Sequence, residues 1–296
     1  MDADPVPQPR ASSDPTAAGD ALGVLHDEVA RRLRSGAVDL PLPPRVATEV
    51  LSLTRDQGAD VARLVRLLHQ DPALAGHVLR IANSPAYLPR TPIVSLQQAV
   101  TRLGLRMLSE IALIASVQSG VFRVPGHEAE LARIWRHAVA SAAFGREIAR
   151  RLRSNVESAF LCGLLHTIGK PLVLQTSVAA ARDGGGRARP EHVAALVEAL
   201  HVEGGLLLAA KWSLPLAVRD AIAGYAGYDT ANGCGREPVI TALADALASH
   251  LLAATLDAPE SRTHRAWADL NLYPEDADAL LARADEVARL VETLVL

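Results

Sequence analysis

The sequence is poor in aromatic residues and has no marked excess of charge of either sign. Aromatic side chains make up 3% of the 296 residues, so the stacked rings that bind single-stranded nucleic acid have few candidates. The 30 Lys and Arg against 33 Asp and Glu leave a formal net charge of -3, which argues against binding through phosphate contacts. We therefore expect no nucleic-acid partner.

Long apolar runs and cysteine are also scarce. The uncharged stretch Ile111–Phe122 has 12 residues, whereas a membrane-spanning helix needs about 20. The two cysteines, Cys162 and Cys234, supply neither a disulfide framework nor a set of zinc ligands. The first 20 residues lack the apolar core of a secretory signal. These absences predict a cytoplasmic protein without a membrane segment.

Apolar residues recur at helical spacing through most of the chain. The pattern is clear in Leu22, Leu25, Val29 and Leu33, and again in Val61, Leu64, Val65 and Leu68. Alternating strand patterns are scarce, so we predict an all-α fold. Residues 1–20 contain four prolines and few bulky apolar groups, which predicts a disordered tail.

Several helix starts can be placed from the local sequence. Asp71 before Pro72 is suited to cap a helix, and Ser95 with Gln98 and Ser154 with Glu157 have the spacing of capping boxes. The last segment, about 277–295, predicts one amphipathic helix. Its apolar face could pack on the same chain, or it could form a homodimer or bind a partner.

The segment Ser154–Pro171 carries the most informative motif. An apolar run precedes His166, which we place in the last turn of a buried helix, with Gly169 suited to a left-handed position at the helix end. Alone, such a histidine is most often a hydrogen-bonded structural residue. The stretch Gly163–Lys170 (GLLHTIGK) resembles the GLLHDIGK signature of HD-superfamily phosphohydrolases, with Thr167 in place of the aspartate.

Further segments resemble, in the same order, the HDOD family, the HD-related output domain. They are Leu42–Pro44 (LPP), Asp71–Leu74 (DPAL), Leu79–Tyr87 (LRIANSPAY), Ser95–Gly104 (SLQQAVTRLG), Trp135–His137 (WRH) and His201–Pro215 (HVEGGLLLAAKWSLP). The resemblance runs from about Val38 to about Leu256. It implies an HDOD domain over 21–256, made of a helical subdomain (22–120) packed on a degenerate HD-like half (125–256), with 257–296 as a C-terminal extension.

The resemblance also identifies a remnant of a metal site. His137 matches the first histidine of catalytic HD sites, His166 the second, and Asp245 the distal aspartate. Thr167 breaks the set, because a neutral hydroxyl cannot replace the anionic oxygen of a carboxylate. The His-His pair of HD-GYP phosphodiesterases is also missing, since the corresponding place reads AIAGYAG at Ala221–Gly227.

Two interpretations of these residues stay open. His137, His166 and Asp245 could hold one zinc or Fe(II)-like ion, or His137, His166 and Thr167 could form hydrogen bonds inside a degenerate site. Asp245 could equally lie on a solvated helix face, and His201 is expected to be structural. We predict no resident metal and no cofactor.

Two further features are candidate interaction sites. Arg146, Arg150, Arg151 and Arg153 form a basic cluster that we place on one long helix, where a solvated face or docking of an anionic partner would both be consistent. Asn83, Ser84, Pro85 and Tyr87 belong to a proline-rich loop that could carry recognition, and Asn83 could close its helix in the left-handed conformation.

The resemblance implies a non-catalytic bacterial signalling protein that acts on other signalling proteins. The alternatives are a divergent metal-dependent phosphohydrolase and a module that binds a nucleotide, such as a cyclic dinucleotide, without turnover.

Overall fold

The computed structural model describes residues 15–53, 61–84, 87, 91–118, 121–187, 189–230 and 233–295. Within these ranges every regular element is a helix, which confirms the all-α fold. The first helices are α1 (Pro15–Ser35), α2 (Arg45–Leu53), α3 (Val61–His69), α4 (Pro72–Ala82), α5 (Leu96–Gln118), α6 (Glu128–Arg151) and α7 (Val156–Leu165). They are followed by α8 (Gly169–Asp183), α9 (Pro190–Lys211), α10 (Leu216–Gly224), α11 (Arg236–Leu252), the short 3-10 helix η1 (Pro259–Arg262), α12 (Ala266–Asp269), α13 (Pro274–Leu281) and α14 (Ala284–Leu294).

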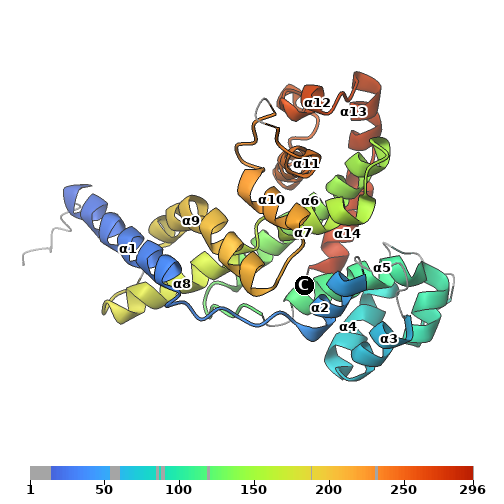
Figure 1. The fold of residues 1–296 in the computed structure, drawn as a ribbon, viewed down its shortest axis with the longest axis horizontal. Helices are drawn as coiled ribbons and strands as arrows, with labels where there is room; N and C mark the ends of the chain where they lie inside the picture. The colour runs from blue at the N-terminus through green and yellow to red at the C-terminus, as the bar shows by residue number, and fades with distance from the viewer. Residues whose placement is uncertain are drawn as a thin grey trace, which may run out of the picture.

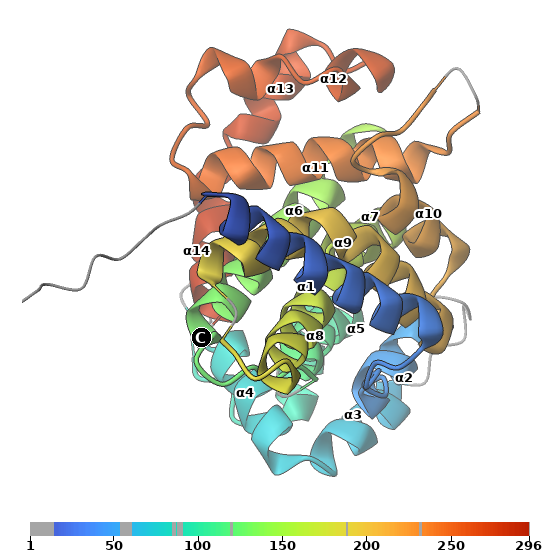
Figure 2. The same cartoon turned by 90° about the vertical axis from the view of Figure 1, so that its left-hand side faces the viewer.

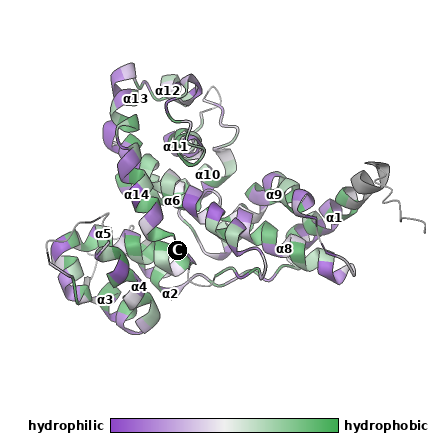
Figure 3. Ribbon diagram, turned by 180° about the vertical axis from the view of Figure 1, so that it is seen from behind, coloured by the Kyte–Doolittle hydropathy of each residue, from purple (hydrophilic) through white to green (hydrophobic). Residues whose placement is uncertain are grey.

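Two groups of helices are joined through α6 and α7, and α10 to α13 lie on a further side of these two helices. Figure 1 shows α2 to α5 gathered at one end and α1, α8 and α9 at the other, with α6 and α7 between them. Polar and apolar residues alternate along outer helices such as α13 and α14, in keeping with one buried and one solvated side (Figure 3).

The position of α1 differs from the prediction in two ways. Residues 1–14 of the predicted disordered tail lie outside the described residues, but α1 begins at Pro15, inside that segment. Proline suits the first helical turn, where a backbone N–H has no partner, and alanines favour the turns that follow. Moreover, α1 packs on α8 and α9 and not on α2 to α5 (Figure 2). An ion pair of 2.9 Å between Arg32 and Asp183 ties it there.

The group α2 to α5 follows the sequence pattern closely. The side chain of Asp71 accepts a hydrogen bond from the Leu74 N–H at 3.0 Å, which confirms the predicted start of α4. Ser95 likewise accepts from the Gln98 N–H. Gly104 interrupts α5 with φ 80°, a conformation that residues with a Cβ rarely adopt. The helix therefore consists of two segments that point in different directions.

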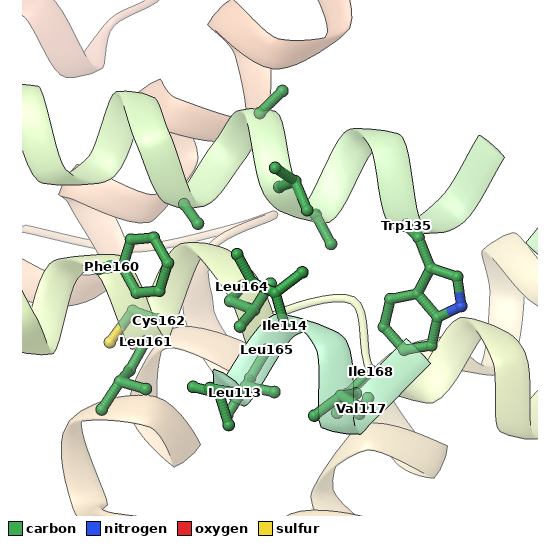
Figure 4. Close-up of a cluster of buried hydrophobic side chains, with 14 of the residues drawn as sticks. Leu113, Ile114, Val117, Trp135, Phe160, Leu161, Cys162, Leu164, Leu165 and Ile168 are labelled. Atoms are coloured by element: carbon green, nitrogen blue, oxygen red, sulfur yellow. The ribbon is translucent and has the colours of Figure 1, made fainter. Parts of the chain in front are cut away.

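The second segment of α5 links the two groups. Leu113, Ile114 and Val117 of α5 lie beside Trp135 of α6 and the apolar run of α7 (Figure 4). This cluster is buried almost completely, so α6 and α7 belong to a core shared by both halves of the molecule.

Two glycines allow helices to approach closely in this core. A Cβ at Gly163 of α7 would overlap the backbone of Ser141 and Ala142 in α6. A Cβ at Gly169 would overlap the backbone of His201 and Gly205 in α9. Gly169 was expected in a left-handed position at a helix end. It instead begins α8, and it lacks a side chain because α9 leaves no room for one.

The C-terminal segment 257–295 is folded back on α6 and α11. The predicted single helix is two helices, α13 and α14, separated at Ala282 and Arg283. The apolar face of α14 (Val287, Leu290, Val291 and Leu294) is buried, and α14 packs on α6. The face on which the homodimer alternative depended is therefore covered by the same chain.

One helix of the described residues, α9, is long and apolar enough to cross a membrane by length and composition alone. Half of its most apolar window is buried inside the molecule, where it packs on α8. Core helices commonly pass the same test, so the feature is weak evidence for a membrane segment.

Candidate functional site

Four helices bring the predicted HD residues together at one cleft of about 630 Å³, with His166 buried behind Asp245 and the others on the cleft wall. His137 comes from α6, His166 and Thr167 from the end of α7, His201 from α9, and Asp245 from α11. Tyr225, at the end of α10, lies among them. These residues were identified by resemblance and are spread over more than a hundred positions of the sequence. The structure brings them together.

His166 occupies the centre of the site and is fully buried. It closes α7, a helix whose N-cap is Asn155 and not the predicted Ser154. The Nδ1 atom lies 2.8 Å from the carbonyl oxygen of Gly163, and Nε2 lies 3.0 Å from Oδ1 of Asp245. A carbonyl only accepts hydrogen bonds, so Nδ1 carries a hydrogen. The Nε2 atom then either donates a second hydrogen to Asp245 or faces a cation together with it.

His137 approaches the same carboxylate from α6. Its Nε2 lies 3.3 Å from Oδ1 of Asp245 and 3.2 Å from Oγ of Ser249. Burial lowers the pKa of His137 to about 4, although the charge of Asp245 opposes this shift. His137 is therefore a neutral imidazole at pH 7.

Asp245 points inward, which decides between the two placements left open by the sequence. Burial raises the pKa of its carboxyl. The hydrogen bond and charge of His166 and the charge of His137 lower that pKa by more, so the net pKa is below its usual value. The carboxylate is therefore ionised and shared between two imidazoles. Its side chain is 30% exposed and borders the cleft.

Thr167 is buried beside this group. Its residue is 1% exposed, and no described residue forms a hydrogen bond with its Oγ1. A buried hydroxyl without a partner costs about 1–3 kcal/mol. The threonine thus neither completes the polar network nor supplies a charged ligand.

His201 is held by hydrogen bonds at both of its ring nitrogens. Its Nδ1 faces the carbonyl oxygens of Val197 and Glu198, at 3.1 and 2.9 Å, and therefore carries the hydrogen. Its Nε2 accepts a hydrogen bond of 2.7 Å from the Tyr225 hydroxyl. Burial raises the pKa of Tyr225, so this hydroxyl keeps its proton. All polar atoms of the His201 ring are satisfied.

Sequence reasoning missed other residues of the cleft, namely Arg133, Lys170, Glu198, Ser249 and His264. The spacing of four between Asp245 and Ser249 on a helix could have indicated Ser249. Lys170 forms an ion pair of 2.7 Å with Glu198 at the edge of the cleft. No local pattern pointed to His264, because it reaches the cleft from the C-terminal extension.

The donor set fits one metal ion and does not fit two. The ligand atoms of His137, His166 and Asp245 lie within 4.8 Å of one another. The hydrogen bond from His166 Nδ1 to a carbonyl is the outer contact that orients metal-binding histidines. Two imidazoles and one carboxylate suit zinc or iron. A second ion would need the acid that Thr167 replaces.

The arginines of the predicted cluster have different environments in the structure. The sequence left open a solvated face or an anionic partner for these residues, but the Arg146 side chain is 12% exposed and pairs with Glu110 of α5 at 3.0 Å. Arg150 is exposed and pairs with Glu147 at 2.6 Å. Arg153 was placed on the helix, but α6 ends at Arg151, and Arg153 has a φ of 51°.

The predicted recognition loop is held by Asn83. Its φ is -93°, so it does not take the left-handed conformation that we expected. Its side-chain amide instead bonds the carbonyls of Leu79 and Ile93 at 2.8 and 2.7 Å and accepts from the Ile93 N–H. Pro85 lies outside the described residues, while Ser84 and Tyr87 are half-buried. Asn83 therefore ties the end of α4 to the backbone at Ile93.

Comparisons with known proteins agree with this fold. A curated relative, described as an uncharacterized protein from Treponema pallidum (strain Nichols), is 26% identical over 62% of this chain and 37% of its own length. The chain thus spans little more than a third of that relative.

Solved structures have the same fold. An HDOD domain protein with unknown function from Geobacter sulfurreducens is 22% identical, with a TM-score of 0.68 over 90% of this chain and 98% of that one. A candidate phosphohydrolase from Shewanella amazonensis SB2B is 23% identical, with a TM-score of 0.66 over 90% and 98%. A candidate signal transduction protein from Marinobacter aquaeolei VT8 is 23% identical, with a TM-score of 0.65 over 97% and 68%.

The HDOD domain matches residues 40–226. The match covers α6 to α10 and includes His137, His166, His201 and Thr167, whereas Asp245 and His264 lie beyond it. With most of the chain matched and the same helical architecture in the solved relatives, the protein belongs to the HDOD family.

Proposed function

We propose that this chain is a non-catalytic regulatory protein that acts by binding other signalling proteins in the cytoplasm. The observation that supports this proposal is Thr167, a buried neutral residue where the HD signature has an acid. Hydrolysis of a phosphoester by an HD site uses metal ions to activate water. Without the acid, the site lacks the ligand needed to bridge two ions.

Direct contacts within the site support the same proposal. The Asp245 carboxylate is engaged by both His137 and His166, and the Tyr225 hydroxyl is bonded to His201. These side chains are satisfied within the protein. The site therefore contributes to the stability of the helical scaffold, and recognition is left to the outer surface.

Thr167 offers a direct test. We expect Thr167→Asp to lower the melting temperature, because an extra carboxylate would be buried near Asp245, and we expect Mn²⁺ not to restore it. Thr167→Val is the matched control, since it removes an unsatisfied hydroxyl at nearly constant volume and should leave stability unchanged or slightly raised. Melting curves with and without Mn²⁺ compare the three proteins.

Metal content and hydrolysis complete the test. The protein purified without chelators is analysed for bound metals and assayed on bis-p-nitrophenyl phosphate and cyclic dinucleotides with Mn²⁺ or Fe²⁺. We expect no turnover. Stoichiometric metal together with turnover that His166→Ala abolishes would overturn the proposal.

The interaction part of the proposal has its own test. Arg150, Arg151 and Arg153 of the predicted arginine cluster are all exposed, and Arg150 and Arg153 are the two that we take as candidate contacts. If they contact an acidic partner, Arg150→Glu with Arg153→Glu should lose a protein that the wild type retains from native lysate. Arg182→Glu is the matched control, because Arg182 is 81% exposed at the distant end of α8. Equal retention by all three would argue against this surface.

The second candidate is a phosphohydrolase that uses a single metal ion. It is favoured by the grouping of His137, His166 and Asp245 within 4.8 Å. These residues would hold the ion, and the ion would supply a water activated for attack on a phosphoester. The protein's own contribution would be orientation: Gly163 fixes the His166 ring and Ser249 contacts the His137 ring.

A further inference from the structure

A second cavity, of about 440 Å³, lies away from the HD site, where α4, the end of α5, the start of α6 and the end of the chain meet. Its volume is in the range of small-molecule sites. Phe122, Val124, Leu131 and Trp135 form an apolar wall, each at most 9% exposed. Trp135 is two residues from His137 on α6.

The indole of Trp135 differs from the other two in the protein. The Nε1–H of Trp212 donates to the Pro41 carbonyl at 2.8 Å, and that of Trp267 donates to the Ser261 carbonyl at 3.1 Å. The Nε1–H of Trp135 has no acceptor among the described residues. Figure 4 shows its nitrogen at the outer edge of the buried cluster. This nitrogen is not fully buried, unlike Nε2 of Gln118 and His77, so its hydrogen can be donated to a ligand in the cavity.

Other groups around the cavity also lack a partner in the part of the chain that the structure describes. Nε2 of Gln118 and Nε2 of His77 are buried and form no hydrogen bond with any described residue. Arg123 is exposed at the opening and has no ion-pair partner among the described residues. The acid at the opening, Glu128, is bonded to the Gly126 N–H at 3.0 Å. The free groups are therefore mainly donors, and they need an acceptor.

We propose that this cavity binds a small carboxylic acid with an apolar body. The apolar part lies against Phe122, Val124 and Leu131, the carboxylate pairs with Arg123, and one of its oxygens accepts from the Trp135 indole. A neutral molecule would leave the guanidinium unpaired, and a phosphate would not fill the apolar wall. This site is separate from the HD residues and does not depend on whether they bind metal.

The three indoles provide a test by nuclear magnetic resonance. In ¹⁵N-labelled protein the indole N–H signal of Trp135 should exchange fastest with solvent, and Trp135→Phe assigns it. We expect phenylacetate at millimolar concentration to shift this signal and to leave those of Trp212 and Trp267 in place. The neutral analogue phenylacetamide should bind about tenfold more weakly, because it cannot pair with Arg123.

Variants at the opening locate the carboxylate. Arg123→Gln should weaken phenylacetate binding about tenfold, and Arg123→Lys should weaken it less. Both changes are at an exposed position, so the fold is kept. Arg182→Gln, at a remote exposed site, should have no effect. The proposal is overturned if neither phenylacetate nor hexanoate shifts the Trp135 signal, or if phenylacetamide and Arg123→Gln leave the affinity unchanged.

Discussion

At the scale of single residues, the backbone carbonyls around the site determine which ring nitrogen of each histidine carries a hydrogen. Carbonyl oxygens at Gly163, Val197 and Glu198 oblige His166 and His201 to carry hydrogen on Nδ1. The two rings then differ only in the partner of Nε2. His201 meets a hydroxyl and is neutral, whereas His166 meets a carboxylate.

His137 makes stability depend on pH. Its pKa is about 4 in the folded protein and 6.5 in an exposed histidine, so the neutral form is favoured by folding. This contribution is complete above pH 6.5 and is lost as the pH falls toward 4, and it amounts to at most about 3 kcal/mol. Urea unfolding at several pH values should show a steeper loss for the wild type than for His137→Gln. Parallel curves would contradict a buried neutral His137.

Gly169 sets the distance between α8 and α9. A Cβ there would meet backbone atoms of His201 and Gly205, which cannot move aside as a side chain can. Gly169→Ala should therefore lower the free energy of unfolding by about 3 kcal/mol or more. Gly76→Ala is the control: Gly76 lies within α4 with no atom near its Cβ position, so alanine should stabilise by about 0.5–1 kcal/mol. Chemical denaturation measures both, and a neutral Gly169→Ala would be inconsistent with the close helix contact.

The histidines and Asp245 could be predicted because each stands in a motif with a chemical meaning. Thr167 was equally visible, since it interrupts a signature. Ser249 and His264 carry no such signal, because they reach the cleft through the packing of α11 and of the C-terminal extension. Asn83 was misjudged for a related reason: its partner, Ile93, is ten residues away along the chain.

At the scale of elements, helix starts were easier to predict than helix ends or breaks. Asp71 caps α4 as predicted because an acid before proline is decided locally. At α7 the cap is one residue later, at Asn155, which accepts from the Glu157 and Ser158 N–H groups, while the Ser154 hydroxyl accepts from Arg236. The break between α13 and α14 has no proline or glycine to announce it. It follows from how the two helices pack on α6.

The ion pair between Arg146 and Glu110 holds α5 against α6. Both side chains are mostly buried, at 12% and 10% exposed. Arg146→Ala would leave Glu110 with only Arg106, and we expect it to lower the free energy of unfolding by about 2–3 kcal/mol. Adding Glu110→Gln should restore part of the loss, because no buried charge remains.

A surface pair serves as the control for this prediction. Arg133 bonds Glu130 at 2.7 Å but is 64% exposed, so Arg133→Ala should cost less than about 1 kcal/mol. Thermal or urea unfolding distinguishes the two effects. Equal losses for Arg146→Ala and Arg133→Ala would mean that the α5–α6 pair does not stabilise the fold.

At the scale of the whole molecule, the C-terminal extension completes the core. Leu294 of α14 is 1% exposed, so Leu294→Ala should lower the free energy of unfolding by about 2–5 kcal/mol. Because the apolar face of α14 is covered within the chain, the melting temperature should not change with protein concentration. A melting temperature that rises with concentration would instead support the dimer that the sequence left open.

The overall fold could be predicted as all-α from periodicity, but the grouping of the helices could not. The sequence suggested that 22–120 forms one unit, whereas α1 lies on α8 and α9. Amphipathic helices show which side is buried and not which neighbour buries it. Ion pairs such as that between Arg32 and Asp183 join positions too distant in the chain to be paired by pattern.

The extent of the family match and the extent of the folded body do not coincide. The matched residues stop at 226, yet α11 lies against α6, α7 and α10 and supplies Asp245. A polypeptide that ends at residue 226 would expose to solvent the faces of α6, α7 and α10 that α11 covers. The imidazoles of His137 and His166 would also lose the carboxylate of Asp245. A fragment of this protein that keeps the folded site must therefore extend through α11, about 26 residues beyond the last matched position.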